Sequence, residues 1–487
     1  MRVGIKRYVS YIRADQFDTR ALLLLSIICY LVFTIWVGYR ASRKVKTAGD
    51  FMLAGRSLPI VLSSSALFAT WFGSETVFGA SSEFLKGGLY SVIEDPFGAA
   101  LCLVLFGLFF ARPLYNLNLL TLGDFFKVRF GHRTELIATI FLAPPYVGYI
   151  AAQLVAMGLI LNVVAGLALW QGVVISAVVV TFYTYVGGMW AISITDFVQS
   201  IIIIVGLLVL AFVLSSKAGG AAAVLSEVPA SDLKFFPSLE WKEMVAWLAA
   251  WSVLGLGSLP SQDVFQRTMS SGSASTAVRS CFIAAGLYLT IAMLPLFISL
   301  CTRHLYPDHV NGDTQLALPK MVMEHTHLIV QVLFFGSLLS AIMSTTSSAI
   351  LAPAAIVSEN LVRPLAKKPL TDRQMLLLTR GAVLLFSAIG TAMACMRSNI
   401  YELVGESSIL SLVSLFAPLV LGLYWSKASS GGAILAMVSG TLTWVILQFV
   451  TWEVPSLVPA TLVSLLGMLL GSLIWKKPAG PVGATST

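Results

Sequence analysis

Long apolar stretches separated by short polar segments run along almost the whole chain. The hydrocarbon core of a bilayer is about 30 Å thick and takes roughly 20 helical residues to cross. Backbone groups inside lipid find no water, so spanning stretches of this kind are predicted to be helices. The pattern predicts an all-α integral membrane protein with about thirteen transmembrane helices. We place them at residues 21–40, 59–83, 89–112, 134–166, 168–187, 189–215, 244–262, 276–302, 326–356, 374–397, 400–425, 429–451 and 455–475.

The composition agrees with this class, because 57% of the 487 residues are apolar and only 11% are charged. No segment between the spans is long enough for a soluble domain. The N-terminal tail, residues 1–20, is charged and is followed by an apolar run without a small-residue cleavage site, so we expect it to be retained. The lipid bilayer is therefore the main surroundings of this chain.

Cysteine and histidine are too sparse to predict a metal or redox centre. The five cysteines (Cys29, Cys102, Cys281, Cys301 and Cys395) lie within or at the ends of spans and show no Cys-x-x-Cys spacing. We expect them to be packing residues. The five histidines fall in loops, and His325 with His327 alone does not suggest a metal site.

The distribution of basic residues predicts the orientation. With the C-terminal tail, residues 476–487, in the cytoplasm, the inner loops hold 19 basic residues, Arg267 among them, and the outer loops hold 7. This bias follows the positive-inside rule and predicts a multi-pass protein of the plasma (inner) membrane. It also explains the net charge of +8 without a nucleic acid partner. The direction of the first helix stays open, because an odd span count puts the basic N-terminal tail outside.

Two spans contain segments that are poor helix formers. These are WFGSETVFG (Trp71–Gly79) and GLGSLP (Gly255–Pro260), and both are expected to unwind partway across the membrane. They lie five spans apart, as an inverted repeat of five plus five helices predicts. The repeats would be residues 59–215 and 244–425, with one helix before them (21–40) and two after (429–475). The alternative is that membrane helices simply tolerate glycine and proline.

A cluster of hydroxyl side chains, MSTTSS (Met343–Ser348), lies at bilayer depth in a later span. Neutral oxygens of this kind suit a small hard cation. The alternative is that serine and threonine bond to the carbonyls of their own helix or join neighbouring helices.

Three sequences together resemble the sodium:solute symporter family, which includes proline, sugar, pantothenate and high-affinity choline carriers. They are DFMLAGRSLP (Asp50–Pro59), YTYVGGMWAISITDFVQ (Tyr183–Gln199) and the hydroxyl cluster. The resemblance covers most of the chain. It implies sodium-coupled symport of a small organic solute by alternating access, with sodium as the coupling ion and the only metal. It also implies a sodium site formed by the carbonyls of Ala69, Phe72 and Ala341 and the hydroxyls of Ser344 and Thr345.

The same resemblance places Asp196 on the cytoplasmic side of the sodium site, where a carboxylate would draw the ion toward its exit. A second interpretation is that Asp196 caps a helix N-terminus. The two roles are compatible.

The solute is expected beside the two interruptions. Trp71 and Tyr149 are the predicted aromatic walls, and TWFG (Thr70–Gly73), GLFFARP (Gly107–Pro113) and PSQDVFQRTMSSGSA (Pro260–Ala274) resemble the choline branch. Choline carriers surround an ammonium group with aromatic faces. Ser261 stands where that branch has an aromatic residue, so a related cationic or zwitterionic solute is also compatible. The further candidates are Ser74, Glu75, Gln153, Gln262 and Trp251, the last as an entry gate or as an ordinary interfacial tryptophan.

Acidic residues at bilayer depth are costly, at about 3 kcal/mol each, and therefore point to a role. Glu75 lies in the first interruption, and Glu94 and Asp95 interrupt the next span. They would serve as counter-ions to the solute, as proton acceptors or as partners of Lys86. Alternatively, Glu94 and Asp95 lie near the headgroups.

Other functions for a chain of this kind are a proton-coupled carrier of the same fold and a membrane sensor derived from it. A sensor would need an appended signalling module, and an enzyme would need a nucleophile, a metal cluster or an acid–base pair near a membrane face. We expect a transporter and no enzyme.

Overall fold

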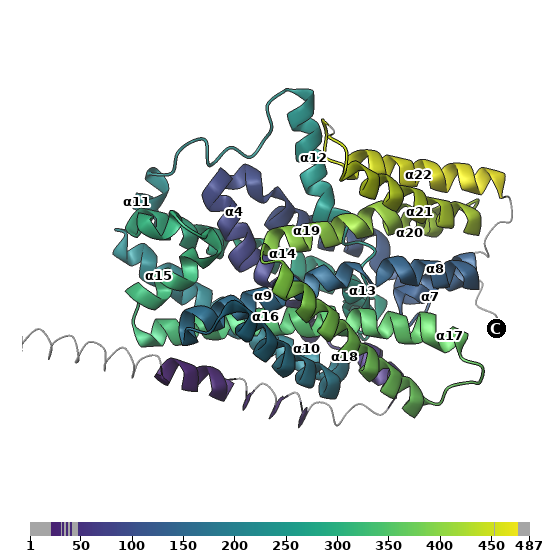
Figure 1. The fold of residues 1–487 in the computed structure, drawn as a ribbon, viewed down its shortest axis with the longest axis horizontal. Coiled ribbons are helices and arrows are strands. Elements are labelled where there is room, and N and C mark those ends of the chain that lie inside the picture. The colour runs from purple at the N-terminus through teal and green to yellow at the C-terminus, as the bar shows by residue number, and fades with distance from the viewer. Residues whose placement is uncertain are drawn as a thin grey trace, which may run out of the picture.

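The computed structural model describes residues 21–30, 32–33, 36–37, 39–40, 47–451 and 453–475. This part of the chain is almost entirely helical, and its only β-pairing is an isolated bridge between Leu58 and Ser271 (Figure 1). The predicted tails, residues 1–20 and 476–487, lie outside the described residues. Within the described ranges, nine helical segments are long and apolar enough to cross a membrane, and three shorter apolar helices accompany them. The count of thirteen spans stays a prediction.

The elements follow one another along the chain with short connections. The first part comprises Ala21–Tyr30, α2 (Ala48–Leu53), η1 (Ala54–Arg56), α3 (Ile60–Trp71), η2 (Glu75–Gly79), α4 (Ala80–Gly87), η3 (Gly88–Val92), η4 (Ile93–Gly98), α5 (Ala99–Leu105), η5 (Phe106–Phe110), α6 (Ala111–Asn116), α7 (Leu122–Phe130), α8 (His132–Leu142), α9 (Pro145–Ala165), α10 (Leu169–Lys217) and α11 (Ala221–Ser226). The second part comprises α12 (Trp241–Gly255), α13 (Gln262–Met269), α14 (Ala274–Leu305), η6 (Pro307–Val310), η7 (Thr314–Leu316), α15 (Ala317–His325), α16 (Leu328–Ile356), η8 (Val357–Val362), α17 (Arg363–Leu365), α18 (Asp372–Met396), α19 (Ile400–Ser411), η9 (Leu412–Phe416), α20 (Ala417–Tyr424), α21 (Ser430–Leu447) and α22 (Leu457–Ile474).

Both predicted interruptions are confirmed. Helix α3 ends at Trp71, and Phe72 has φ −84° and ψ 79°, outside the helical range, before the chain resumes in η2 and α4. Helix α12 ends at Gly255, and α13 begins only at Gln262. Each interruption therefore frees backbone groups in the interior of the molecule.

Helix α10 contains the predicted boundary between the fifth and sixth spans as a sharp kink at Gly188. Gly188 has φ 59° and ψ −173°, a conformation that is almost exclusive to glycine. A Cβ built there would lie 2.5 Å from the ring of Phe51. Phe51 of α2, the segment before α3, therefore packs directly against the kink between the two halves of α10.

Helices of the first predicted repeat pack directly against helices of the second. Helices α10 and α16, α3 and α14, and α9 with both α18 and α19 lie in contact, and each pair joins residues 59–215 to residues 244–425. Helices α21 and α22 form a separate antiparallel pair at one side of this bundle (Figure 1). They approach so closely that a Cβ built on Gly471 would lie 2.7 Å from Cα of Gly432. Such small-residue contacts are usual between membrane helices.

The sequence predicts a polar cytoplasmic turn for Gln266–Thr276, and this is wrong for its first residues, which lie in α13. Helix α13 is buried along its whole length although it contains Asp263, Gln266 and Arg267. These polar residues resemble a loop in the sequence, but they bond to other buried groups in the fold. Arg267 therefore does not belong among the inner-loop charges.

We expect Gly188→Ala to destabilise the protein. The backbone strain alone costs about 1–3 kcal/mol, and the contact with Phe51 adds to it. Thermal unfolding of purified protein should show a lower midpoint than wild type. Gly381→Ala in α18 is the matched control, because nothing lies within 4 Å of a Cβ built there. An equal effect of the two substitutions would contradict the role of the Gly188 conformation.

Candidate functional site

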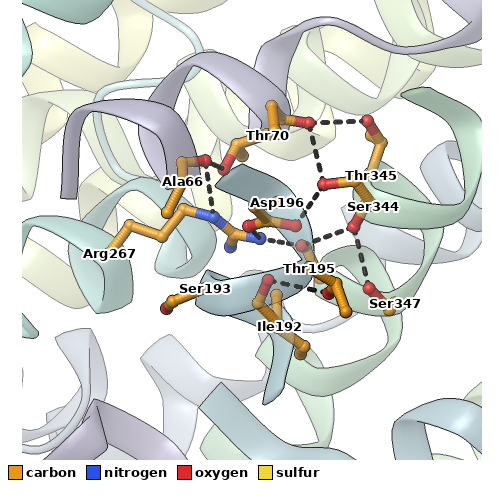
Figure 2. Close-up of polar contacts among 12 residues, drawn as sticks. Ala66, Thr70, Ile192, Ser193, Thr195, Asp196, Arg267, Ser344, Thr345 and Ser347 are labelled. Atoms are coloured by element: carbon orange, nitrogen blue, oxygen red, sulfur yellow. Dashed lines mark hydrogen bonds and ion pairs between the residues drawn. The ribbon is translucent and has the colours of Figure 1, made fainter. Parts of the chain in front are cut away.

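Four oxygen atoms from α3 and α16 converge where α3 ends. The Thr345 hydroxyl lies 3.0 Å from the carbonyl oxygen of Ala69 and 3.1 Å from that of Ala341, and the Ser344 hydroxyl lies 3.4 Å from the Ala69 oxygen. Ser344, Thr345 and Ala69 are all buried. Figure 2 shows the two hydroxyls of α16 facing α3. We call these four atoms the oxygen group.

Phe72 lies at the end of α3, three residues after Ala69. Its N–H donates to the Phe68 carbonyl at 3.0 Å, so the last helical bond is kept. Its ψ of 79° turns its own carbonyl away from the helical direction. The carbonyl of Phe72 is thereby released from the helix, as a ligand in an interrupted helix must be.

The remaining hydroxyls of the cluster bond within α16. Thr346 donates to the Ile342 carbonyl at 2.5 Å, and Ser347 and Ser348 donate to the Ser344 carbonyl at 2.9 and 2.8 Å. The alternative interpretation of the cluster, bonding to its own helix, therefore holds for these three. Only Ser344 and Thr345 reach across to α3.

Asp196 lies beside the oxygen group and is completely buried. The Ser344 hydroxyl donates to one carboxylate oxygen, and Nη2 of Arg267 lies 3.5 Å from the other (Figure 2). The interpretation of Asp196 as a helix cap is wrong, because the residue lies inside α10, eight positions after the kink at Gly188.

Arg267 is a site residue that the sequence did not reveal. Its side chain is fully buried, its Nε donates to the Ala66 carbonyl at 3.0 Å, and its Nη2 donates to the Ser348 hydroxyl. Its Nη1 has no hydrogen-bond partner among the described residues. A carboxylate buried at position 196 requires a compensating positive charge. That requirement could have led to Arg267 from the sequence alone.

A cavity lies between the two interruptions and next to the oxygen group. Its aromatic walls are Trp71, Tyr146 and Tyr149, and its two carboxylates are Glu75 and Asp263. Among the residues that the structure describes, no lysine, arginine or histidine lines it. The other lining residues are Leu142, Pro145, Leu254, Gly257, Ser258, Pro260, Ser261, Val404, Ser407, Ser408 and Ser411. Asp263 was not predicted; it accepts a hydrogen bond from the Tyr146 hydroxyl at 2.8 Å.

Gln153 of α9 holds the unwound segment in place. Its Oε1 accepts from the backbone N–H of Ser74 at 3.0 Å, and its Nε2 donates to Glu75 at 2.7 Å. The Tyr149 hydroxyl lies 3.0 Å from the Glu75 carboxylate and 3.1 Å from the Thr70 carbonyl. One amide side chain thus replaces the helical partners that the interruption removes.

Gly73 is the point at which the cavity and the oxygen group meet. A Cβ built there would lie 2.7 Å from Oε2 of Glu75, 3.0 Å from Oε1 of Gln153 and 3.0 Å from Oγ1 of Thr345. Only a glycine leaves room at this point, where side chains of the cavity and of the oxygen group approach the unwound backbone together.

Four predicted solute residues do not line this cavity: Ser74 and Gln153, which bond to each other at the unwound segment, and Gln262 and Trp251. Gln262 accepts from the backbone N–H of Leu122 at 2.7 Å. Trp251 packs against Phe97, Phe235 and Trp247, with ring centroids 5.8 to 6.3 Å apart. These positions favour structural roles for Gln262 and Trp251.

Glu94 and Asp95 occupy different surroundings. Asp95 is fully buried and accepts from Thr76 at 3.0 Å and from Tyr288 at 2.5 Å, so the headgroup interpretation is wrong for it. Glu94 is only half-buried. Lys86 pairs with Glu83 at 2.7 Å, so the expectation that Lys86 pairs with these acids is also wrong.

We expect the Arg267 and Asp196 side chains to be strongly coupled. Removing one partner of a buried ion pair leaves an uncompensated charge, at a cost of about 3–5 kcal/mol. Arg267→Gln and Asp196→Asn should each lower the unfolding midpoint, and the double variant should lose much less than the sum of the two. Thermal unfolding of the three variants measures this, and additive losses would contradict the pairing.

Comparison with known proteins identifies the relatives of this chain. The model of the sodium:solute symporter family matches residues 51–440. A high affinity choline transporter of Homo sapiens is 27% identical over 438 residues, covering 86% of this chain and 75% of that protein. A high-affinity proline transporter of Bacillus subtilis (strain 168) is 28% identical over 480 residues, covering 92% of this chain and 97% of the relative.

Solved structures share the fold. A Na⁺-coupled sialic acid symporter in a substrate-bound outward-open state has a TM-score of 0.84 at 18% identity, over 94% of this chain and 98% of that one. A nucleobase-cation-symport transporter has a TM-score of 0.54 at 15% identity, over 87% of this chain and 94% of that one. The family match, the relatives and the apolar helices describe a multi-pass transporter of the plasma membrane and not an enzyme. The chain belongs to the sodium:solute symporter family.

Proposed function

We propose that this protein is a sodium-coupled symporter that imports a small organic cation by alternating access. The observation that carries the solute class is the cavity, which combines two carboxylates with three aromatic side chains and has no basic residue in its lining. Both features stabilise a bound cation, because carboxylates attract positive charge and aromatic faces bind ammonium groups by cation–π contacts.

Sodium coupling is supported by the chemistry of the oxygen group. Sodium is a hard cation that prefers neutral and anionic oxygen ligands, and carbonyls with hydroxyls hold it without preventing its release. The carbonyls of Ala69, Phe72 and Ala341 and the hydroxyls of Ser344 and Thr345 would hold it here. The sialic acid symporter of the same fold is Na⁺-coupled, and in this chain the hydroxyls of α16 reach α3.

The proposed sites are coupled through the unwound segment. The side-chain oxygens of Thr345, Glu75 and Gln153 all lie within 3.0 Å of the point that a Cβ on Gly73 would occupy, so an ion that orders this segment would also order the solute cavity. The linkage is reciprocal, and the solute should raise sodium affinity by the same factor. A membrane potential of 100 mV adds about 2.3 kcal/mol of driving force for each inward sodium charge.

Asp196 is proposed to receive sodium on its way to the cytoplasm. Its carboxylate contacts Ser344 of the oxygen group and faces Arg267 on the other side. The guanidinium partly neutralises the carboxylate, which keeps Asp196 from holding the ion too tightly for release.

Within the choline branch, the cavity departs from a complete aromatic box. Ser261 lines it, and its hydroxyl donates to the Ser258 carbonyl at 2.5 Å. Three walls are aromatic and the side formed by the second interruption is polar. An ammonium compound with a polar group on that side fits this lining better than a purely apolar cation, and betaine or proline are the zwitterionic alternatives.

A proton-coupled carrier is the second candidate. Glu75 and Asp95 are buried and accept hydrogen bonds, and neither pairs with a basic side chain in the described part of the chain. Such carboxylates need either a proton or a cationic ligand. Uptake into proteoliposomes under a sodium gradient or a proton gradient separates the two candidates.

We expect Thr345→Ala to raise the sodium concentration for half-maximal uptake by about tenfold or more, since it removes one ligand worth about 1.5–3 kcal/mol. Thr346→Ala is the matched control, because Thr346 bonds only to the Ile342 carbonyl of its own helix. Solute uptake in proteoliposomes measured against sodium concentration checks this. Equal sodium dependence in the two variants would contradict the proposed site.

We expect Glu75→Gln to weaken uptake of a cationic solute more than that of a zwitterion, because it removes a buried negative charge from the cavity. Truncating one partner of a buried charge pair costs about 2–5 kcal/mol. Uptake of choline, betaine and proline by wild type and variant gives the comparison. Glu402→Gln, on an exposed residue, is the control. A selective loss of zwitterion uptake would contradict the proposal that the solute is a cation.

A further inference from the structure

The connection between α14 and α16 brings together three side chains that bind metals. Nε2 of His309, in η6, lies 3.0 Å from Nε2 of His325, at the end of α15. A carboxylate oxygen of Glu324 lies 3.6 Å from Nε2 of His309. The three candidate ligand atoms all lie within 4.8 Å of one another. In the sequence, His325 lies closest to His327. In the structure, the histidine that lies against His325 is His309.

The two imidazoles are held in a defined arrangement. Tyr306 stacks on His325 with a centroid distance of 3.8 Å and an interplanar angle of 5°. The His309 ring stands at 77° to the His325 ring, with the centroids 5.2 Å apart. The His309 side chain is 13% exposed and that of Glu324 is 58% exposed. The cluster is therefore ordered by its neighbours and still accessible from outside.

We propose that His309, Glu324 and His325 form a binding site for a divalent transition-metal ion of the Zn²⁺ class. Zinc is held by imidazole nitrogens and carboxylate oxygens, and Zn–N bonds of about 2.0–2.1 Å in a tetrahedral site put two nitrogens roughly 3.3 Å apart. The two Nε2 atoms need to separate by only a few tenths of an ångström from their present distance. Three protein ligands leave the fourth position for water, as in zinc sites that remain open.

Metal in this site would fasten η6 to the end of α15. The same connection contacts other elements of the fold, because Thr314 of η7 hydrogen-bonds to Ser82 of α4. Gln315 accepts from the backbone N–H of Ile400 at the start of α19, at 3.1 Å. Helix α15 leads directly into α16, which carries Ser344 and Thr345. Binding is therefore expected to slow solute uptake by restraining this outer connection.

The neighbouring residues give matched controls. His327 is exposed and lies two positions after His325, at the start of α16, outside the cluster. His304 pairs with Glu227 at 2.7 Å. The exposed thiols of Cys29 and Cys395 stay the same in every histidine variant, so they set a common background for metal binding.

The test is titration calorimetry of the purified full-length protein with ZnCl₂ alone, without solute. We expect one saturable site in wild type, and an affinity at least tenfold weaker in His309→Ala, in His325→Ala and in the double variant. His327→Ala should bind as wild type does. The proposal is overturned if wild type shows no saturable binding, or if His309→Ala and His325→Ala bind zinc as tightly as His327→Ala.

A second readout guards against loss of folding in a variant. Zinc should raise the thermal unfolding midpoint of wild type and of His327→Ala, and leave that of His309→Gln and His325→Gln unchanged. Each midpoint with zinc is compared with the midpoint of the same protein without metal, which also shows whether the variant is folded. An equal zinc-induced rise in the Gln variants would overturn the site. Binding is measured without transport, so its outcome is separate from that of the proposed symport.

Discussion

The backbone groups freed where α3 stops inside the bilayer are the constraint on which the rest of this structure depends. Lipid supplies no hydrogen-bond partners, so an interrupted helix needs side chains or a bound ion to replace its lost bonds. The side-chain oxygen of Gln153 accepts from the Ser74 N–H, and the Thr345 hydroxyl donates to the Ala69 carbonyl. The same groups that satisfy the interruption also form the two candidate binding sites.

Charge in the interior is arranged around this segment in two different ways. Asp196 and Arg267 compensate each other beneath the oxygen group, so that carboxylate is available without being an isolated charge. Glu75 has hydrogen-bond donors but no basic partner in the described part of the chain. A cavity lined by carboxyl groups and aromatic rings lies beside an oxygen group whose neighbouring carboxylate is already paired, and the proposal that two cations bind together rests on this arrangement.

The sequence predicted the parts of this arrangement that depend on local chemistry. Glycine and proline weaken a helix wherever they lie, so the interruptions after Trp71 and after Gly255 were foreseen, and a hydroxyl cluster at bilayer depth pointed to α16. The resemblance to the symporter family singles out Ser344 and Thr345. The structure adds that these two hydroxyls face α3, whereas those of Ser347 and Ser348 bond within α16. Arg267 and Asp263 were missed because a short buried helix rich in polar residues has the composition of a loop. Its burial follows from partners distant in the sequence, such as Asp196 and Tyr146.

Equilibrium binding of radioactive sodium to the purified protein, without any solute, measures whether the oxygen group is a sodium site. We expect saturable binding that excess unlabelled sodium displaces and that disappears when Ser344 and Thr345 are both replaced by alanine. Absence of saturable binding in wild type, or unchanged binding in the double variant, would contradict this site.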